Sequence, residues 1–495
     1  MSKGFRSTFK TFNSEVTGSC LMIKNKRPGE QYERIVVDAG GFNEKQYEDL
    51  NSKLDFDPSD VSHLILTHAH YDHIYKTPYF VKNGYKGEIY CSPASKELIK
   101  IALNDSLRIM QSEHDKYGKE MLYSKENVEQ TISQLRGIEY NLPTHISKGI
   151  KVTFLGNGHL FGAVCVLMQI SCKKYEDKNI LITGDYYPNN ELFDIPCIPE
   201  WVKRLPNLTI IQESTYGNVS VNDVNYCFEN YVTSSLNNGK NILLPVISLE
   251  RLEIVLNKLK FMQEEETLNS SVKIFIHTEL GRQYLENVYL SSRNIKEFMP
   301  KNVEILSKDD YETALKYPFN KIIISSSGMA DKGTVRFYLK NILQNKNYSI
   351  IFTCYTEKST LGHKLRTMQK GDTVRIDDLD LALLCDVKHT GEFSRHVKFE
   401  QILDFINQFD SVKNILLTHG TTNTKEQLLK KLSDVYPDKD ICVMCREVGF
   451  KLDKELNIST YTPTYYSMSK KDKKLKVRKC KGNSKCGNNN SELYT

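Results

Sequence analysis

Four histidines and one aspartate lie within eleven residues, His63 to His73, of a 495-residue chain that has only 12 histidines. Residues two apart on an extended segment point to the same side, so His68 and His70 can face a common point. Asp72 and His73 follow at the expected turn into a helix and can face a second point nearby. Imidazole and carboxylate without thiolate is the ligand set of hydrolytic zinc sites, which keep positions open for water. The stretch "HAHYDH" therefore predicts a metal centre, in preference to a solvated loop or a pair of core histidines.

Further ligand-type residues stand at the exits of other apolar runs. They are Asp38 after "RIVV", His159 in "TFLGNGHLFGA", Asp185 after "ILITG" and His419 after "NILLT". The glycines around His159 permit tight backbone turns beside the imidazole. Because strand ends on one rim of a sheet bring distant parts of a sequence together, we expect these side chains to meet.

The elements that must position these residues follow from hydrophobic patterning. Short runs rich in Val, Ile and Leu recur along the chain, and several are continuous, as in strands that are covered on both faces. Between them lie segments with helical spacing of apolar residues, such as "SPASKELIKIALNDSLRIMQ", where Pro93 suits a first helical position. The fold class predicted is α/β, with sheets packed between helices.

Composition bounds the class of protein. The chain is too long for one core, and its 40% apolar and 26% charged residues are typical of a globular protein. With neither a long apolar stretch nor a secretory leader, we expect a soluble, cytoplasmic protein without a membrane segment. Residues 470–495 hold nine Lys or Arg against two acidic residues, a charge of +7. The net charge of +6 therefore comes from this tail, and the body is not basic.

At this point the chain resembles the metallo-β-lactamase superfamily, whose signature HxHxDH matches His68 to His73. Within it, the chain is similar to the β-CASP branch of nucleic-acid hydrolases. The matching motifs are Glu213 in "IIQESTYG", His396 in "EFSRH" and His419 in "LLTHG". The resemblance covers roughly residues 15–450. It is strongest to RNA-processing members: bacterial and archaeal ribonucleases and the catalytic subunit of the cleavage and polyadenylation machinery.

The resemblance implies an αββα sandwich with an inserted α/β cap. The sandwich would comprise residues 1–215 and 369–450, the cap residues 216–368, and a basic, disordered tail residues 451–495. In this arrangement the active site would lie in the cleft between the sandwich and the cap.

The resemblance also implies roles for single residues. One zinc ion would be bound by His68, His70 and His159, a second by Asp72, His73 and His419, with Asp185 bridging both; Mn²⁺ is the alternative metal. The catalytic residues would be Asp72, His396, Glu213 and Asp38. His396 would assist the leaving group, Glu213 would orient His396, and Asp38 would fix the tautomer of a ligand histidine.

Two loops are candidates for binding RNA phosphates. They are "SSSGMADKG", with Ser326, Ser327 and Gly328, and "CYTEKSTLG", with Ser359 and Thr360. Each joins a strand to a helix, so backbone amides at the helix start could face an anion, although Ser and Thr often serve only as caps there. Cys442 and Cys445 have zinc-knuckle spacing, but their strand-like surroundings favour reduced thiols.

The leading hypothesis is a zinc-dependent ribonuclease that cleaves single-stranded RNA internally, with a 5′-to-3′ exonuclease mode as a second expectation. It would leave 5′-phosphate and 3′-hydroxyl ends. Two alternatives stay open: a DNA nuclease on the same scaffold, and an RNA-binding pseudoenzyme or complex subunit. The partner expectations beyond RNA are a homodimer or an RNA-processing complex.

Overall fold

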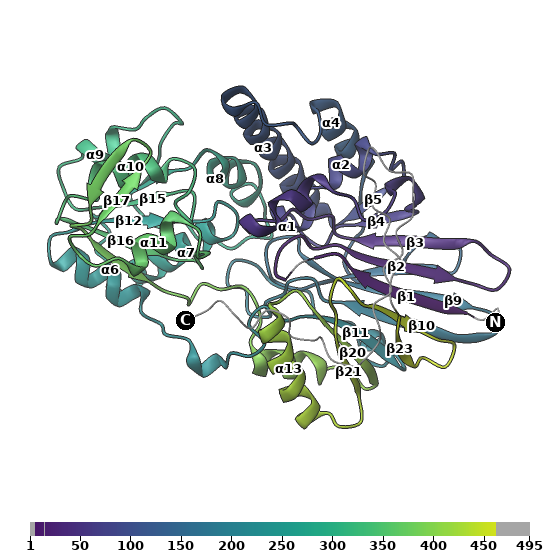
Figure 1. Cartoon of the computed structure of the whole chain (residues 1–495). Helices are drawn as coiled ribbons and strands as arrows, with labels where there is room; N and C mark the ends of the chain where they lie inside the picture. Colours follow the sequence, from purple (N-terminus) through teal and green to yellow (C-terminus); the bar gives the residue numbers. More distant parts are fainter. Residues whose placement is uncertain (1–4, 14, 462–495) are drawn as a thin grey trace, which may run out of the picture.

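Two β-sheets packed face to face form the larger lobe of the protein, at the right of Figure 1. The computed structural model describes residues 5–13 and 15–461. The first sheet runs in the order β23 (Ile458–Tyr461), β22 (Gly449–Leu452), β1 (Arg6–Thr11), β2 (Leu21–Lys26), β3 (Tyr32–Val37), β4 (His63–Ile65), β5 (Ile89–Cys91) and β6 (Leu135–Gly137). The second runs in the order β21 (Asp440–Val443), β20 (Val412–Thr418), β11 (Leu208–Glu213), β10 (Tyr175–Ile182), β9 (Val164–Cys172), β8 (Ile150–Gly156) and β7 (Thr144–Ser147).

Helices cover the outer face of each sheet. Successive side chains of a strand point to opposite faces of the sheet, and both faces are apolar, so both must be covered. On β3, Ile35 and Val37 enter the core between the sheets, whereas Val36 packs outward under the helices. The helices of this lobe are α1 (Tyr71–Ile74), α2 (Thr77–Lys82), α3 (Pro93–Tyr117), α4 (Lys125–Gln134), α5 (Glu200–Lys203), α12 (Phe399–Ile406) and α13 (Thr422–Val435). The lobe is therefore the αββα sandwich that the family resemblance implies.

The smaller lobe, at the left of Figure 1, is a cap built on a parallel sheet. Its strands run in the order β14 (Val303–Ile305), β13 (Lys273–His277), β15 (Lys321–Ser325), β12 (Asn241–Pro245), β16 (Tyr348–Phe352) and β19 (Asp386–His389). Its helices are α6 (Phe228–Asn237), α7 (Arg251–Glu264), α8 (Glu279–Tyr284), α9 (Thr313–Lys316), α10 (Val335–Ile342) and α11 (Leu361–Thr367). A hairpin of β17 (Thr373–Ile376) and β18 (Leu379–Ala382) is attached. Every residue of β15 and β16 is buried, as the continuous apolar runs predict.

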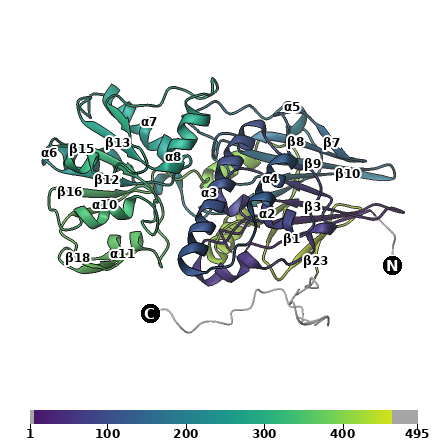
Figure 2. The same ribbon diagram turned by 90° about the horizontal axis from the view of Figure 1, so that it is seen from above.

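Helix α3 lies where the two lobes meet, as Figure 2 shows. It begins at Pro93 as predicted, with the Ser92 side chain accepting a hydrogen bond from the Ser95 amide, and it ends at Gly118 in the left-handed region. Near that end, Glu113 Oε1 lies 2.9 Å from Nζ of Lys332 in the cap. Among the described helices, none combines the length and the apolar composition that crossing a membrane requires.

Two expected boundaries differ from the structure. Strand β19 pairs in parallel with β16, so the cap sheet extends past residue 368 to His389. Residues 451–461, expected in the tail, complete β22 and form β23, because Phe450, Leu452 and Leu456 are buried in the core of the sandwich. The remainder of the expected tail, residues 462–495, lies outside the described residues.

Candidate metal centre

The loops after β4 and β8 bring three imidazoles to one point. His68 Nε2 lies 3.2 Å from His70 Nδ1, which lies 3.1 Å from His159 Nε2. His159 comes from the loop after β8, where Gly158 has φ 74° and a Cβ atom would lie 2.2 Å from the Tyr187 carbonyl oxygen. Only glycine fits this turn, as the sequence pattern suggests. These three histidines form the first cluster of ligand atoms.

Asp72, His73 and His419 form a second cluster. Asp72 Oδ2 lies 3.9 Å from His73 Nε2 and 3.8 Å from His419 Nε2. His419 follows β20 and has a left-handed backbone with φ 48°, which is uncommon for a residue other than glycine. Strain of this kind at a side chain that faces a cluster is typical of functional sites.

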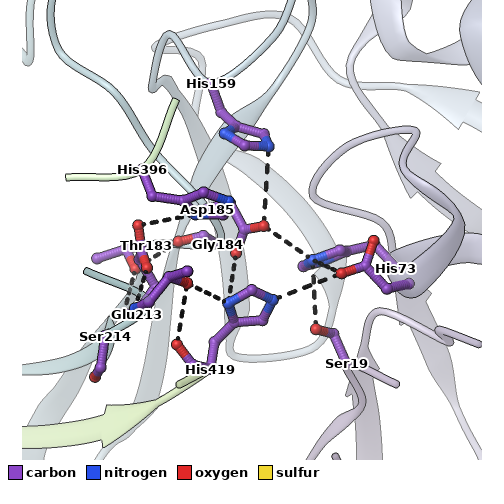
Figure 3. A network of polar contacts seen from close by, with 12 residues as sticks. Ser19, His73, His159, Thr183, Gly184, Asp185, Glu213, Ser214, His396 and His419 are labelled. Carbon is purple, nitrogen blue, oxygen red and sulfur yellow. Dashed lines mark hydrogen bonds and ion pairs between the residues drawn. The ribbon is translucent and has the colours of Figure 1, made fainter. Parts of the chain in front are cut away.

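Asp185 lies between the two clusters, at the end of the loop after β10 (Figure 3). Its Oδ2 atom lies 3.3 Å from His73 Nε2 and 3.8 Å from His159 Nε2, and its Oδ1 atom lies 3.3 Å from His419 Nδ1. The carboxylate is 2% exposed. It therefore contacts members of both clusters, which is the placement expected of a bridging ligand.

Hydrogen bonds behind the clusters orient the imidazoles. The Asp38 carboxylate accepts from His73 Nδ1 at 2.7 Å, and also from the amide and the hydroxyl of Thr67 at 2.7 and 2.8 Å. His159 Nδ1 donates to the carbonyl of Arg395 at 2.7 Å. With Nδ1 protonated in this way, the Nε2 lone pairs of His73 and His159 face the space between the clusters.

The charge balance of the centre favours a cation. Burial lowers the pKa of His68 and His159 well below the usual value, and that of His70 to about 4. Around His73, burial is outweighed by Asp185 and Asp38, which raise its pKa well above the usual value. The Asp185 and Asp38 carboxylates therefore favour positive charge beside them, which a bound cation would supply.

A Glu213 and His396 pair borders the clusters. Glu213 is 1% exposed, and its Oε1 atom lies 3.4 Å from His396 Nδ1. The other carboxylate oxygen accepts from the Thr215 amide at 2.8 Å. The His396 ring lies 4.9 Å from that of His159, centre to centre. Burial lowers the pKa of His396, but Glu213 and Asp185 outweigh it and raise this pKa above the usual value.

The donor set fits two divalent cations. Each cluster offers three nitrogen or oxygen atoms within 4.8 Å of one another, and Asp185 can serve both. Two of these atoms, Asp185 Oδ1 and His419 Nε2, are buried without a hydrogen-bond partner among the described residues. Buried polar atoms without partners are costly unless another ligand binds them.

Comparison with known families agrees with this geometry. The model of the metallo-beta-lactamase superfamily matches residues 18–212, and the model of the Beta-Casp domain matches residues 250–365. The chain thus contains a metallo-β-lactamase domain together with a Beta-Casp domain. Glu213, His396 and His419 lie outside both matched ranges, so their place in the β-CASP site depends on the geometry.

Similar β-CASP proteins come from bacteria, fungi and archaea. Ribonuclease TTHA0252 of Thermus thermophilus is 26% identical over 82% of this chain and 91% of its own length. Endoribonuclease YSH1 of Candida glabrata is 26% identical over 86% of this chain and 56% of its own length. Transcription termination factor FttA of Methanosarcina mazei is 24% identical over 82% and 65%. The chain thus spans most of the bacterial relative but less than two thirds of the other two.

The two predicted phosphate loops of the β-CASP cap use their polar groups differently. Ser359 donates its amide and hydroxyl hydrogens to the Glu357 carboxylate, and Thr360 caps α11 by accepting from the His363 amide. In this loop the capping alternative describes Thr360, whereas Ser359 is held by the Glu357 carboxylate. Ser326 donates to the Thr278 hydroxyl and Ser327 to the Lys332 carbonyl, while Gly328 packs against Cys354 and Ile247.

Sequence reasoning missed residues that act through small polar groups or the backbone. Thr67 links Asp38 to the histidine loop, and the Thr215 hydroxyl lies 3.0 Å from His419 Nδ1. The signal for Thr67 was its place directly before His68. Arg395 acts through its carbonyl group, which no side-chain pattern reveals. No metal cluster of described residues includes Cys442 or Cys445.

Proposed function

We propose that this chain is a metal-dependent ribonuclease that hydrolyses phosphodiester bonds of single-stranded RNA. The observation that carries the proposal is the complete pair of three-residue clusters joined by Asp185 and bordered by Glu213 and His396. The ribonuclease and endoribonuclease names of the relatives support RNA as the substrate and internal cleavage as the mode. A 5′-to-3′ exonuclease mode is the second expectation.

The donor set supports two zinc ions, with manganese as the alternative. Imidazole and carboxylate groups suit both metals, and the absence of thiolate among the clustered residues suits a catalytic site more than a structural one. When bound, such a pair of ions neutralises the phosphodiester oxygens and lowers the pKa of water, which supplies the nucleophile at neutral pH.

The chain's own residues hold the geometry that this chemistry needs. Asp38 keeps the His73 proton on Nδ1, and the Arg395 carbonyl does the same for His159, so both rings keep a lone pair directed inward. Because Asp38 is 4% exposed, water does not compete for this hydrogen bond. We assign Asp38 a positioning role.

Beside the clusters, His396 is the group we assign to the leaving oxygen. Water adds to phosphorus and releases a proton to the solvent, the bond between phosphorus and the 3′ oxygen breaks, and that oxygen takes the proton that His396 donates. The products are a 5′-phosphate and a 3′-hydroxyl. Glu213, 3.4 Å from Nδ1, stabilises the imidazolium form and fixes the ring orientation.

A nuclease assay with matched oligonucleotides tests the proposal. One single-stranded sequence is made as RNA and as DNA, labelled at either end, and incubated with the wild-type protein or with Asp72→Ala. We expect internal cuts in the RNA that the variant does not make. Mononucleotides released from a 5′ label would reveal the exonuclease mode. Preferential cutting of the DNA would favour a DNA nuclease, and RNA binding without cleavage would favour a binding subunit.

The assembly state belongs to the same proposal. A homodimer or an RNA-processing complex is the expected form, and light scattering of the purified full chain gives the mass that distinguishes a dimer from a monomer.

A further inference from the structure

The carboxyl edge of the cap sheet lies beside the metal centre. All strand pairs of this sheet are parallel, so the ends of β12, β15, β16 and β19 meet at one edge. Seven residues beyond the end of β19, the chain reaches His396. In open parallel sheets, ligands bind outside the carboxyl ends of the strands. The edge is therefore where a strand of substrate leaving the metal centre would pass.

Two arginines at this edge have no acidic partner within the described part of the chain. Arg251 begins α7, after β12, and its Nη1 atom donates to the Thr353 carbonyl. Arg366 lies in α11, after β16, and its Nη1 atom donates to the Thr356 hydroxyl at 2.6 Å. Among the described residues, no carboxylate lies within ion-pair distance of either guanidinium, and the Nε atom of each is buried without a hydrogen-bond partner.

A partly buried histidine lies next to these arginines. His389 ends β19, and its Nε2 atom is also buried without a hydrogen-bond partner among the described residues. Burial, then the charges of Arg366 and Arg251, lower the pKa of His389 to about 4. Cations that are withdrawn from water without a counter-ion are costly, and a bound anion removes that cost.

Aromatic residues connect the arginines to the catalytic site and to solvent. The Tyr216 ring lies 6.1 Å from that of His396, centre to centre, and the charge of Arg251 acts on the Tyr216 hydroxyl, opposing the rise in pKa that burial causes. Tyr355 lies three residues beyond the end of β16 and is 59% exposed, with Arg366 near its hydroxyl. Exposed aromatic rings of this kind stack on bases of single-stranded nucleic acids.

A strained turn fixes the start of α7. Glu250 has φ 68° and ψ −46°, and the Arg251 amide donates to the Leu249 carbonyl at 2.9 Å across it, a three-residue turn that is rare for L-residues. The Glu250 carboxylate accepts from Asn190 Nδ2 and from the Tyr289 hydroxyl, each at 2.8 Å.

The same turn is connected to the metal centre. Asn190 Nδ2 also donates to the carbonyl of Gly158, the residue before His159. Because Glu250 shares Asn190 with this loop, the position of Arg251 is fixed relative to a ligand histidine. Backbone strain that is held by buried hydrogen bonds in this way indicates that the direction of the following side chain matters.

We propose that Arg251 and Arg366 form an anion subsite of the cap that binds a backbone phosphate of the RNA next to the scissile one, with Tyr355 stacking on a neighbouring base. The subsite rests on the proposed ribonuclease function and names how that function holds its substrate. It differs from the two predicted phosphate loops, because guanidinium side chains and not backbone amides bind the phosphate.

Binding of RNA without metal tests the subsite separately from catalysis. The probe is a fluorescein-labelled ten-nucleotide single-stranded RNA, titrated with the full chain in EDTA at several salt concentrations and followed by anisotropy. We expect Arg251→Gln and Arg366→Gln each to weaken binding about 10- to 100-fold. Each should also lower the slope of log affinity against log salt by about 0.7.

The matched control is Arg375→Gln, which removes the same charge from the cap. Arg375 is 61% exposed and pairs with Asp380 on the β17–β18 hairpin, so affinity should stay as in the wild type. Because Arg251→Gln also removes a hydrogen bond to Thr353, Arg251→Lys is compared with it. The lysine variant should recover the salt slope, whereas equal loss in both variants would indicate a structural defect and contradict the subsite.

The outcomes separate the two proposals. If the wild-type protein cleaves RNA and both glutamine variants bind and cleave RNA equally well, the subsite is overturned. The proposed ribonuclease function is then unaffected. Weakened binding by both variants, together with no metal-dependent cleavage by the wild type, would support the subsite and contradict the ribonuclease. Wild-type protein that neither binds nor cleaves RNA would contradict both.

Discussion

Replacing Glu250 by glutamine should stabilise the protein at high pH and not at low pH. The carboxyl group is 3% exposed, and burial raises its pKa from 4.5 to about 7. Because this folded-state pKa lies above the unfolded value, the protonated carboxyl contributes fully to the free energy of unfolding below pH 4.5. This contribution is lost as the pH rises through 7. The difference between the two pKa values corresponds to a loss of about 3 kcal/mol in the free energy of unfolding above pH 7.

Glutamine is a close mimic of the protonated acid at this position. Its carbonyl oxygen can accept from Asn190, and its amide can donate to the Tyr289 hydroxyl oxygen, so both contacts of the wild type persist. The substitution therefore removes the buried negative charge without removing the hydrogen bonds that hold the strained turn.

Unfolding by urea, followed between pH 4.5 and 8.5 for the wild type and Glu250→Gln, measures the effect. The two should coincide near pH 4.5, and the variant should become more stable between pH 4.5 and 7, by about 3 kcal/mol at the plateau. Glu264→Gln is the control, because Glu264 lies on the same helix but its side chain is 56% exposed. A Glu250→Gln variant that is less stable at pH 8, or equally shifted at all pH values, would refute the reasoning.

Three other predictions concern the site and the sandwich core. His396→Ala should slow RNA cleavage by about 10²- to 10⁴-fold with unchanged metal content by elemental analysis; parallel loss of metal would contradict its role. Asp38→Asn should weaken metal binding by about 10- to 100-fold in a chelator competition, because the variant loses the acceptor for His73 Nδ1. Lys178→Met should raise stability against urea by about 2 to 4 kcal/mol at pH 6.5, since burial lowers the pKa of Lys178 to about 7. This gain should shrink as the pH rises towards 10.5, and a constant gain would exclude a desolvated lysine.

Much of the site could be predicted because its ligands are marked by residue type and place. His68 and His70 are identified by their spacing, and Asp185 and His419 by standing directly after apolar strands. These residue types are informative because few other positions at the end of an apolar strand tolerate a histidine or an aspartate. Groups that act through the backbone leave no such mark, so the Arg395 carbonyl could not be foreseen.

Some strands could not be located from the sequence, because their residues carry little pattern. The run "LALLC", residues 381–385, is one of the short apolar runs, but only Leu381 and Ala382 of it lie in β18, and the cap sheet takes the more polar "DVKH" as β19 instead. A short strand at the edge of a sheet needs apolar residues on one face only, so its sequence is weakly marked. Arg251 was also missed, because its lack of a carboxylate partner among the described residues depends on the fold and not on its sequence neighbours.

The most direct test of the central claim is a metal titration of RNA cleavage. Wild-type protein is stripped with a chelator, and Zn²⁺ is added back in measured amounts while cleavage of a labelled single-stranded RNA is followed, with Asp185→Asn in parallel. We predict no cleavage by the stripped protein, full recovery at two ions per chain, and no recovery in the variant, because it lacks the carboxylate that contacts both clusters. Cleavage by the stripped protein, or recovery in Asp185→Asn equal to that of the wild type, would contradict the account.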